Sequence, residues 1–480
     1  MKHYLLPDVS EPGKVGVNLP LSDVPEIEMP GAEMLREELD LPEVSEVEVV
    51  RYFTALSRMN YGVDTGFYPL GSCTMKYNPR VGEDIAKLPG FTLIHPLQPA
   101  GTSQGVLKLM YELQQYLTEL TGMFATSLTP MAGAHGELAN IFMIKAYHEV
   151  HGDKKRHIIL VPDSSHGTNP ATASMGGFDV SAVPSDENGN VDMGALKSLL
   201  TNEVAALTLT MPTTLGLFDP QMEEISRLVH EGGALLCGDG ANMNSLIGRV
   251  KFGDLGFDCV QLNLHKSFGT PHGGGGPGAG PVCVKDSLVD FLPSPVVAKD
   301  GNGYSFVKPI KSIGRIGAAY GNFGVMVKAY AYIRSLGADG LKDVSRDAVI
   351  NANYIKEKLK QDYHLPYDRT CMHEVVFSGK KQKAKGVHTL DVAKRLIDYG
   401  FHPPTIYFPL IVDEALMIEP TETESKRALD SFIDAMKAIA KEASENPEIL
   451  RTAPHNAPVR RLDEVRAARN PDLEWVMGKH

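Results

Sequence analysis

Short apolar runs alternate with helical patterns through the middle of the chain. The runs occupy residues 157–161, 180–183, 205–211, 234–237, 259–262 and 281–284. Continuous apolar strands separated by helices are typical of a parallel sheet that is covered on both faces. The pattern therefore predicts an α/β domain, and ligands in such domains bind beyond the carboxyl ends of the strands.

The chain has a different pattern on either side of this region. Residues 1 to about 90 are rich in proline and acidic residues, with a helical stretch at 45–60, and they predict an arm that wraps over another body. Beyond residue 322 the sequence predicts helices at 324–341, 348–361, 389–399 and 424–444 and apolar runs at 374–377 and 410–418. We therefore expect an arm (1–90), a large α/β domain (91–325) and a small α+β domain (326–480).

Length, net charge and the shortness of the apolar runs exclude several classes of protein. A chain of 480 residues exceeds the size of a single core, so at least two domains are expected. The net charge of -12 argues against a nucleic-acid partner, because binding phosphates requires a basic face. Apolar runs are too short to span a membrane, and Pro7 and Asp8 interrupt the N-terminus before a signal-peptide core could form. We expect a cytoplasmic protein without a membrane partner.

The five cysteines are widely spaced, with no CxxC pair. They are interpreted as reduced thiols rather than as a disulfide framework or a metal site. His265 and His272 could be imagined as metal ligands, but no carboxylate or thiol stands nearby at ligand spacing. No metal is therefore predicted.

Lys266 lies between the apolar run 259–262 and a glycine-rich stretch, Gly273 to Gly276 with Pro277 and Gly278. A lysine at the carboxyl end of a buried strand either reaches water or works as a desolvated amine, and Schiff-base chemistry uses the second state. The glycines allow the backbone to approach a bound group or a neighbouring subunit, although alone they are weak evidence.

Polar residues follow two other predicted strands. Asp239 follows the run 234–237 after Gly238, and there its carboxylate could pair with a cationic ring nitrogen; a turn or helix-cap aspartate is the alternative. His166 follows the run 157–161 and could stack on an aromatic cofactor or act as an acid or base; a structural loop histidine is the alternative. Because strand ends gather at one edge of a parallel sheet, both could face one ligand.

Gly133 and Ala134 open an apolar helical stretch that runs to about residue 150. Small residues at a helix start expose backbone N–H groups, and the helix dipole there favours a phosphate. A phosphate-binding helix start, a ring-stacking histidine, an aspartate and a lysine, in this chain order, match pyridoxal-phosphate enzymes. The expected fold is the aspartate-aminotransferase-like one, fold type I.

Five longer motifs narrow the resemblance to one family. These are YPLGSCTMKYNP at 68–79, SHGTNPA at 165–171, DGANMN at 239–244, NLHK at 263–266 and MIEPTE at 417–422. They resemble the glycine cleavage system P-protein family, the glycine dehydrogenases (decarboxylating, aminomethyl-transferring). In length the chain resembles the C-terminal half of the two-half enzyme, which is called subunit 2 when it is a separate chain and which carries the cofactor lysine.

The resemblance implies a role for each candidate residue. Lys266 would hold pyridoxal 5'-phosphate as an internal aldimine, Asp239 would pair with the pyridinium nitrogen, and His166 would stack on the ring. Gly133, Ala134, Thr214 and His265 would contact the phosphate or the edge of the cofactor. Glycine would lose its carboxylate as carbon dioxide, and the aminomethyl group would pass to the lipoyl arm of the H-protein.

The resemblance also implies partners and leaves alternatives. A homologous subunit 1 would join this chain in a two-plus-two heterotetramer, and the H-protein would bind transiently. Arg315 and the loop 68–78 are candidates for binding the glycine carboxylate, and Cys73 in that loop is either a redox-sensitive or a plain thiol. The rival functions are another pyridoxal-phosphate decarboxylase or aminotransferase, and a non-catalytic scaffold subunit, against which Lys266 and Asp239 argue.

Overall fold

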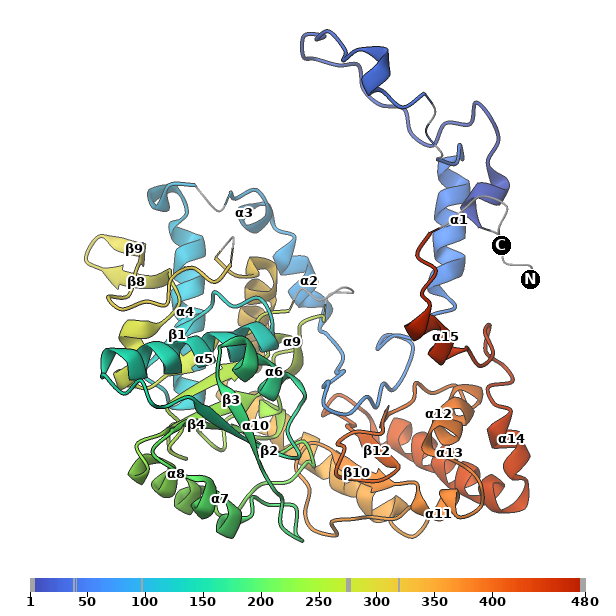
Figure 1. The fold of residues 1–480 in the computed structure, drawn as a ribbon. Coiled ribbons are helices and arrows are strands. Elements are labelled where there is room, and N and C mark those ends of the chain that lie inside the picture. The colour runs from blue at the N-terminus through green and yellow to red at the C-terminus, as the bar shows by residue number, and fades with distance from the viewer. Residues whose placement is uncertain are drawn as a thin grey trace. The chain divides into compact units, whose positions relative to one another are not determined.

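The computed structural model describes residues 5–37, 39, 41–95, 98–272, 278–317 and 320–474. The chain divides into two compact units, Met1–Thr65 with Ala457–His480, and Gly66–Asn456 (Figure 1). The stretch 273–277 that follows Lys266 lies outside the described residues. The division of the chain into an arm and two domains stays a prediction.

The first unit consists of short helices joined by extended chain. Its elements are η1 (Leu6–Val9), η2 (Ala32–Met34), α1 (Glu46–Ser57) and α15 (Glu464–Arg469). Helix α1 begins with a capping box, in which the Ser45 backbone N–H donates to Glu48 Oε2 at 2.8 Å. Between these helices, apolar side chains such as Leu19, Leu21 and Ile27 are exposed.

A seven-stranded sheet forms the centre of the second unit, in the order β1-β7-β6-β5-β4-β2-β3 (Figure 1). The strands are β1 (Ala125–Ser127), β2 (Ile158–Pro162), β3 (Asp179–Val183), β4 (Val204–Thr210), β5 (Leu235–Gly240), β6 (Cys259–Leu262) and β7 (Val282–Val284). The six predicted runs all form strands, and the sequence interpretation missed β1, which has three residues.

The central sheet is mainly parallel, as the expected fold type implies. Strands β2 to β6 pair in parallel, whereas β7 is antiparallel to both β6 and β1. A parallel return to the sheet would need a crossover, usually a helix, but the described part of the connection from β6 to β7 carries only the short helix α9 (Leu264–Ser267). The chain therefore turns back at this point and forms an antiparallel strand.

Both faces of this sheet are buried, as the continuous apolar runs require. Leu236 and Val260 belong to one core cluster, and their neighbours Leu235 and Cys259 belong to another on the opposite face. The covering helices include α4 (Gln104–Thr121), α5 (Gly133–Val150), α6 (Thr168–Met175), α7 (Met193–Leu199) and α8 (Met222–Glu231). The remaining elements of this region are α2 (Arg80–Ala86), α3 (Pro89–Thr92), η3 (Ala100–Thr102), η4 (Met243–Ser245), η5 (Asp286–Phe291) and the hairpin of β8 (Val296–Asp300) and β9 (Gly303–Val307).

Helix α10 (Phe323–Leu359) leads from this sheet to a second one. It consists of two helical segments that meet at Gly337, whose φ of 63° is left-handed, so the predicted break is present but lies earlier than expected. The second sheet has the antiparallel order β10-β12-β11, with β10 (Val375–Ser378), β11 (Thr405–Ile406) and β12 (Ala415–Ile418). Strand β12 is shorter than the predicted run 410–418, because residues 410–414 form turns.

Helices α11 (Lys380–Lys383), α12 (Thr389–Asp398), α13 (Lys426–Glu445) and α14 (Pro447–Arg451) accompany this small sheet. It has its own core, in which Phe377 and Leu416 from the strands pack with Phe432 and Ile439 from α13. The predicted helices at 389–399 and 424–444 correspond closely to α12 and α13.

Candidate active site

A cavity of about 160 Å³ lies at the carboxyl ends of the parallel strands. Its wall consists of Ser72, Gly133, Ala134, Glu137, His166, Thr168, Thr210, Thr214, Asp239, Ala241, Asn242, Asn263, His265 and Lys266. All seven candidate site residues from the sequence are in this wall. The parallel strands bring them together because each candidate lies at the end of a strand, follows a strand or opens a helix at the same edge of the sheet.

Asp239 is a buried carboxylate that is fixed from four sides. Its side chain is 2% exposed at the end of β5. Oδ1 accepts from the Ala241 backbone N–H at 2.9 Å and from the Gln261 amide, and Oδ2 accepts from Thr210 Oγ1 at 3.2 Å and Asn169 Nδ2 at 3.4 Å. A carboxylate with such fixed geometry can hold a cationic group in the cavity in one orientation.

Glu137 is a second buried carboxylate in the wall, and the sequence interpretation missed it. Oε1 accepts from Thr168 Oγ1 and Oε2 from Asn169 Nδ2, both at 2.9 Å. Burial, followed by the charge of Asp239, raises the pKa of Glu137 to about 7. A signal was available in the sequence: Glu137 lies four residues after Gly133 in α5, and residues at this spacing share a helix face.

His166 lies in the loop between β2 and α6. Its Nδ1 is 2.9 Å from Thr168 Oγ1 and accepts from the Thr168 backbone N–H at 3.2 Å. The ring is accessible from the cavity, yet the surrounding protein removes enough water to lower its pKa, and the charge of Lys266 acts in the same direction. A neutral imidazole with a fixed edge is suited to stacking on a planar ligand.

Lys266 lies in α9, directly beyond β6, and is half-buried. Its Nζ donates to the backbone carbonyl oxygen of Ser72 at 2.7 Å. The neighbouring rings of His265 and His272 are 5.1 Å apart, edge to face. Burial is the main cause that lowers the pKa of His265 to about 3 and of His272 to about 4. Both rings are therefore neutral at physiological pH.

The start of helix α5 forms another part of the wall. Among the described residues no side chain caps this helix, so the first backbone N–H groups stay available to an anion. A Cβ on Gly133 would collide with the side chain of Asn263, whose buried Oδ1 has no hydrogen-bond partner in the part of the chain that the structure describes. The wall thus keeps a polar hollow beside the helix start.

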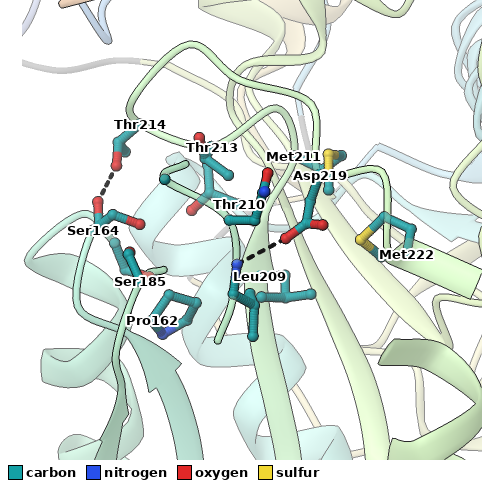
Figure 2. A pocket seen from close by; sticks show the side chains of 14 residues that line it. Pro162, Ser164, Ser185, Leu209, Thr210, Met211, Thr213, Thr214, Asp219 and Met222 are labelled. Atoms are coloured by element: carbon teal, nitrogen blue, oxygen red, sulfur yellow. Dashed lines mark hydrogen bonds between the residues drawn. The ribbon is translucent and has the colours of Figure 1, made fainter. Parts of the chain in front are cut away.

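Thr214 stands between this cavity and a smaller neighbouring one, which Figure 2 shows. Its Oγ1 donates to the Ser164 carbonyl oxygen, and Asp219, on another side of the smaller cavity, accepts from the Val191 backbone N–H at 2.9 Å. The Thr214 hydroxyl proton is therefore already used by the protein, and the hydroxyl oxygen can act toward a ligand only as a hydrogen-bond acceptor.

The candidates for binding a substrate carboxylate, Arg315 and the loop 68–78, differ in whether they line the cavity. Arg315 is exposed, with its guanidinium 5.4 Å from the Tyr320 ring, and it is not among the residues of the wall. In the loop 68–78, Ser72 reaches the wall, whereas Cys73 lies behind it, where burial raises the pKa of its thiol. Lys76 is buried and its Nζ is 2.5 Å from Glu422 Oε1, so its charge is already paired.

Comparison with solved structures defines the class of protein. The chain superposes on a crystal structure of glycine decarboxylase (P-protein) of the glycine cleavage system with a TM-score of 0.72 and 22% identity, over 85% of this chain and 93% of that one. A cysteine desulfurase from Thermococcus onnurineus matches with a TM-score of 0.61 and 16% identity, over 79% and 95%. The fold is that of the pyridoxal-phosphate-dependent enzymes of the aspartate-aminotransferase type.

Sequence comparison then identifies the family. The family model described as glycine cleavage system P-protein matches residues 15–307, and the one described as glycine dehydrogenase, C-terminal domain, matches residues 344–458. The chain belongs to the glycine cleavage system P-protein family. It is 61% identical to a probable glycine dehydrogenase (decarboxylating) subunit 2 of Caldanaerobacter subterraneus subsp. tengcongensis, over 99% of this chain and all of that one. A relative of the same description from Listeria monocytogenes is 56% identical over 97% of this chain and 96% of its own length.

Proposed function

We propose that this chain is the cofactor-bearing subunit 2 of a glycine dehydrogenase (decarboxylating). It removes carbon dioxide from glycine and passes the aminomethyl group to the lipoyl arm of an H-protein. Relatives that match over their full length support this proposal, and so does the cavity. The observation that carries it is the presence of Lys266 and Asp239 on the wall of one cavity at the strand ends.

The residues of the wall fit pyridoxal phosphate. The uncapped start of α5 at Gly133 and Ala134 offers N–H groups to a phosphate, the buried carboxylate of Asp239 suits a cationic ring nitrogen, and His166 presents a neutral ring. When bound, pyridoxal phosphate supplies an electron sink for the electron pair left on the glycine α-carbon as carbon dioxide departs.

Each side chain has a separate task in this proposal. Lys266 would hold the cofactor through Nζ and would release it when the amine of glycine takes its place. Asp239, whose carboxylate direction is fixed by four donors, would hold a proton on the ring nitrogen. His166 would stack on the ring, while His265 and Thr214 would contact the edge of the cofactor.

The exposed apolar side chains of the arm support the proposal that this chain has a stable partner subunit. Its apolar side chains are exposed to an extent that a free chain would not favour; Leu21 is 96% exposed and Ile27 is 85% exposed. We propose that they contact a homologous subunit 1 in a two-plus-two heterotetramer, with an obligate interface of more than ~2,000 Å². The H-protein binds transiently, because its lipoyl arm enters and leaves in every cycle.

We propose the cytoplasm as the location of this chain. All five cysteines are free thiols, which suits a reducing compartment. In the described part of the chain, no helix is both long enough and apolar enough to cross a membrane.

The test is glycine–carbon dioxide exchange by the chain assembled with subunit 1. We expect isotope exchange that requires both pyridoxal phosphate and lipoylated H-protein. A free amine or a keto acid formed without H-protein would point to the rival decarboxylase or aminotransferase. Absence of the cofactor's visible absorbance would point to a scaffold subunit.

A further inference from the structure

The loop from Gly71 to Lys76, called the 71–76 loop below, contains two backbone conformations that side chains disfavour. Ser72 has a φ of 63° and Thr74 a φ of 46°, both left-handed. Thr74 is β-branched, for which a left-handed φ is an outlier. A strained backbone of this kind persists where the surrounding structure holds it, and such strain clusters at functional sites.

Two buried carboxylates hold this loop. The Ser72 backbone N–H donates to Glu374 Oε2 at 2.7 Å. The Thr74 backbone N–H donates to Glu419 Oε2 at 2.9 Å, and Thr74 Oγ1 donates to Glu419 Oε1 at 2.5 Å. Each strained residue thus has its own buried carboxyl group as a hydrogen-bond acceptor.

The small sheet brings these carboxylates together. Strands β10 and β12 pair with Val375 opposite Ile418, so the preceding Glu374 and the following Glu419 lie at the same end of the ladder. The loop joins this end directly, because Leu70 forms a bridge to Ile418 and the Glu419 N–H donates to the Pro69 carbonyl at 3.2 Å.

His373 completes what we call the buried cluster, His373, Glu374 and Glu419, each 0% exposed. The His373 Nε2 atom is 3.2 Å from Glu374 Oε1. Burial alone would lower the pKa of His373, but the charges of Glu374 and Glu419 outweigh it and raise that pKa. A proton on His373 offsets part of the negative charge of the cluster.

The cluster fits a proton better than a metal ion. Its three ligand atoms lie within 4.8 Å of one another. Three of the four carboxylate oxygens, however, already accept from the 71–76 loop. The remaining one, Glu374 Oε1, faces His373. A cation would have one imidazole nitrogen and one unengaged carboxylate oxygen here, too few for a firm site.

The same loop contacts the candidate cofactor lysine. Ser72 offers its N–H to Glu374 and its carbonyl oxygen to Lys266 Nζ, which is 2.7 Å away. The left-handed φ of Ser72 sets the direction of both groups. A change at Glu374 is therefore transmitted to Lys266 through one residue.

We infer that the buried cluster is a positioning device: by holding Ser72 left-handed, it fixes the carbonyl oxygen that accepts a hydrogen bond from Lys266 Nζ whenever that lysine is not bonded to the cofactor. The inference rests on the proposed function. When the amine of glycine takes the place of Lys266, the lysine leaves as a free amine, and the Ser72 carbonyl gives it a hydrogen-bond partner. Glu374 and Glu419 do not touch the cofactor and act through the loop.

The first test measures the loop in the cofactor-free chain assembled with its partner. Hydrogen exchange followed by mass spectrometry should show slow exchange in the peptide that spans residues 68–78. Glu374→Gln or Glu419→Gln should speed it by about tenfold or more, because one oxygen of the carboxyl group becomes an amide NH2, which cannot accept a hydrogen bond from the loop. Glu414→Gln is the matched control, since Glu414 is also a buried carboxylate of the small sheet but accepts from the Thr389 N–H at 2.8 Å. Unchanged exchange in the two cluster variants would overturn the inference.

The second test measures release of Lys266. Borohydride trapping counts the cofactor still attached to the Lys266 peptide at increasing glycine concentration, without H-protein. We expect Glu374→Gln to raise, by roughly fivefold, the glycine concentration at which half of the cofactor is released from Lys266. Glu414→Gln should leave this concentration unchanged. Normal release in Glu374→Gln would overturn the inference even if the loop exchanges faster.

A third variant separates positioning from a direct charge effect. Ser72→Gly keeps the carbonyl and adopts a left-handed φ without strain. In the Glu374→Gln background it should recover part of the release, and no recovery would assign the effect to charge and overturn positioning by the loop. If the unmodified chain carries no cofactor on Lys266, the proposed function fails instead, and the exchange measurement on the loop still stands.

Discussion

One side-chain amide links Glu137 to Asp239: Asn169 Nδ2 lies 2.9 Å from Glu137 Oε2 and 3.4 Å from Asp239 Oδ2. Two buried carboxylates on one cavity wall repel each other unless a proton or a cation is shared between them. This arrangement favours a cationic ligand, and burial together with the charge of Asp239 raises the pKa of Glu137.

The stability of the cofactor-free chain should depend on Glu137. Its pKa is raised from 4.5 to about 7 on folding, so between these values the folded chain binds more protons than the unfolded one. The free energy of unfolding should therefore fall as pH rises through this window, by about 1 to 3 kcal/mol, and then stay level. Chemical denaturation at several pH values measures this. Glu137→Gln, which is neutral throughout, should flatten the profile and be the more stable form at pH 8. An equal slope in the variant would contradict the assignment.

Asp239→Asn should keep the fold and slow decarboxylation by ~10²-fold or more, because the charge that stabilises the protonated ring is removed while the shape is nearly unchanged. Single-turnover kinetics with glycine measures the step. Asp219→Asn is a matched control: Asp219 is equally buried, at 2%, but lines the smaller cavity of Figure 2. A near-normal rate in Asp239→Asn would show that another group holds the ring nitrogen.

His166→Ala should weaken retention of pyridoxal phosphate as well as rate, because the stacking area is lost. Equilibrium dialysis gives the dissociation constant directly. His166→Phe keeps a ring but loses the contact with Thr168 Oγ1, so it should recover much of the retention. Unaltered affinity in His166→Ala would mean that the histidine is a structural loop residue.

Borohydride reduction should fix the cofactor to Lys266, because an imine is reducible only while the bond exists. Peptide mapping identifies the labelled lysine. Lys76 is the informative alternative, since it is a buried lysine of the second unit. Its Nζ, however, already donates to Glu422 Oε1 at 2.5 Å, Asn244 Oδ1 at 2.6 Å and the Ser267 carbonyl oxygen at 3.0 Å. Label on Lys76 would overturn the cofactor assignment.

Replacing the exposed apolar residues Leu19, Leu21 and Ile27 of the arm by serine should abolish co-purification with subunit 1, since burial of these side chains drives the contact. Size-exclusion chromatography with light scattering gives the assembly state, and circular dichroism checks that the chain stays folded. Leu410→Ser, which changes an 85% exposed side chain outside the arm, is the control. A monomer with full exchange activity would contradict the subunit proposal.

The sequence by itself determined the elements and the chemistry that follow local rules. Continuous apolar runs became β2 to β7, because a strand buried on both faces needs apolar side chains at every position. Lys266 and Asp239 lie at strand ends for the same reason: the polar residue comes where the buried strand stops. The motifs around them were enough to identify the family.

Tertiary structure decided what depends on pairing between distant segments. The sequence does not show that β7 runs antiparallel, nor that the register of β10 and β12 sets Glu374 beside Glu419. It also does not show that Ser72 stands between Glu374 and Lys266, because 302 residues separate Ser72 from Glu374 and 194 separate it from Lys266. Apolar periodicity reports the buried face of one element, whereas contacts between elements follow from strand register and packing of the whole fold.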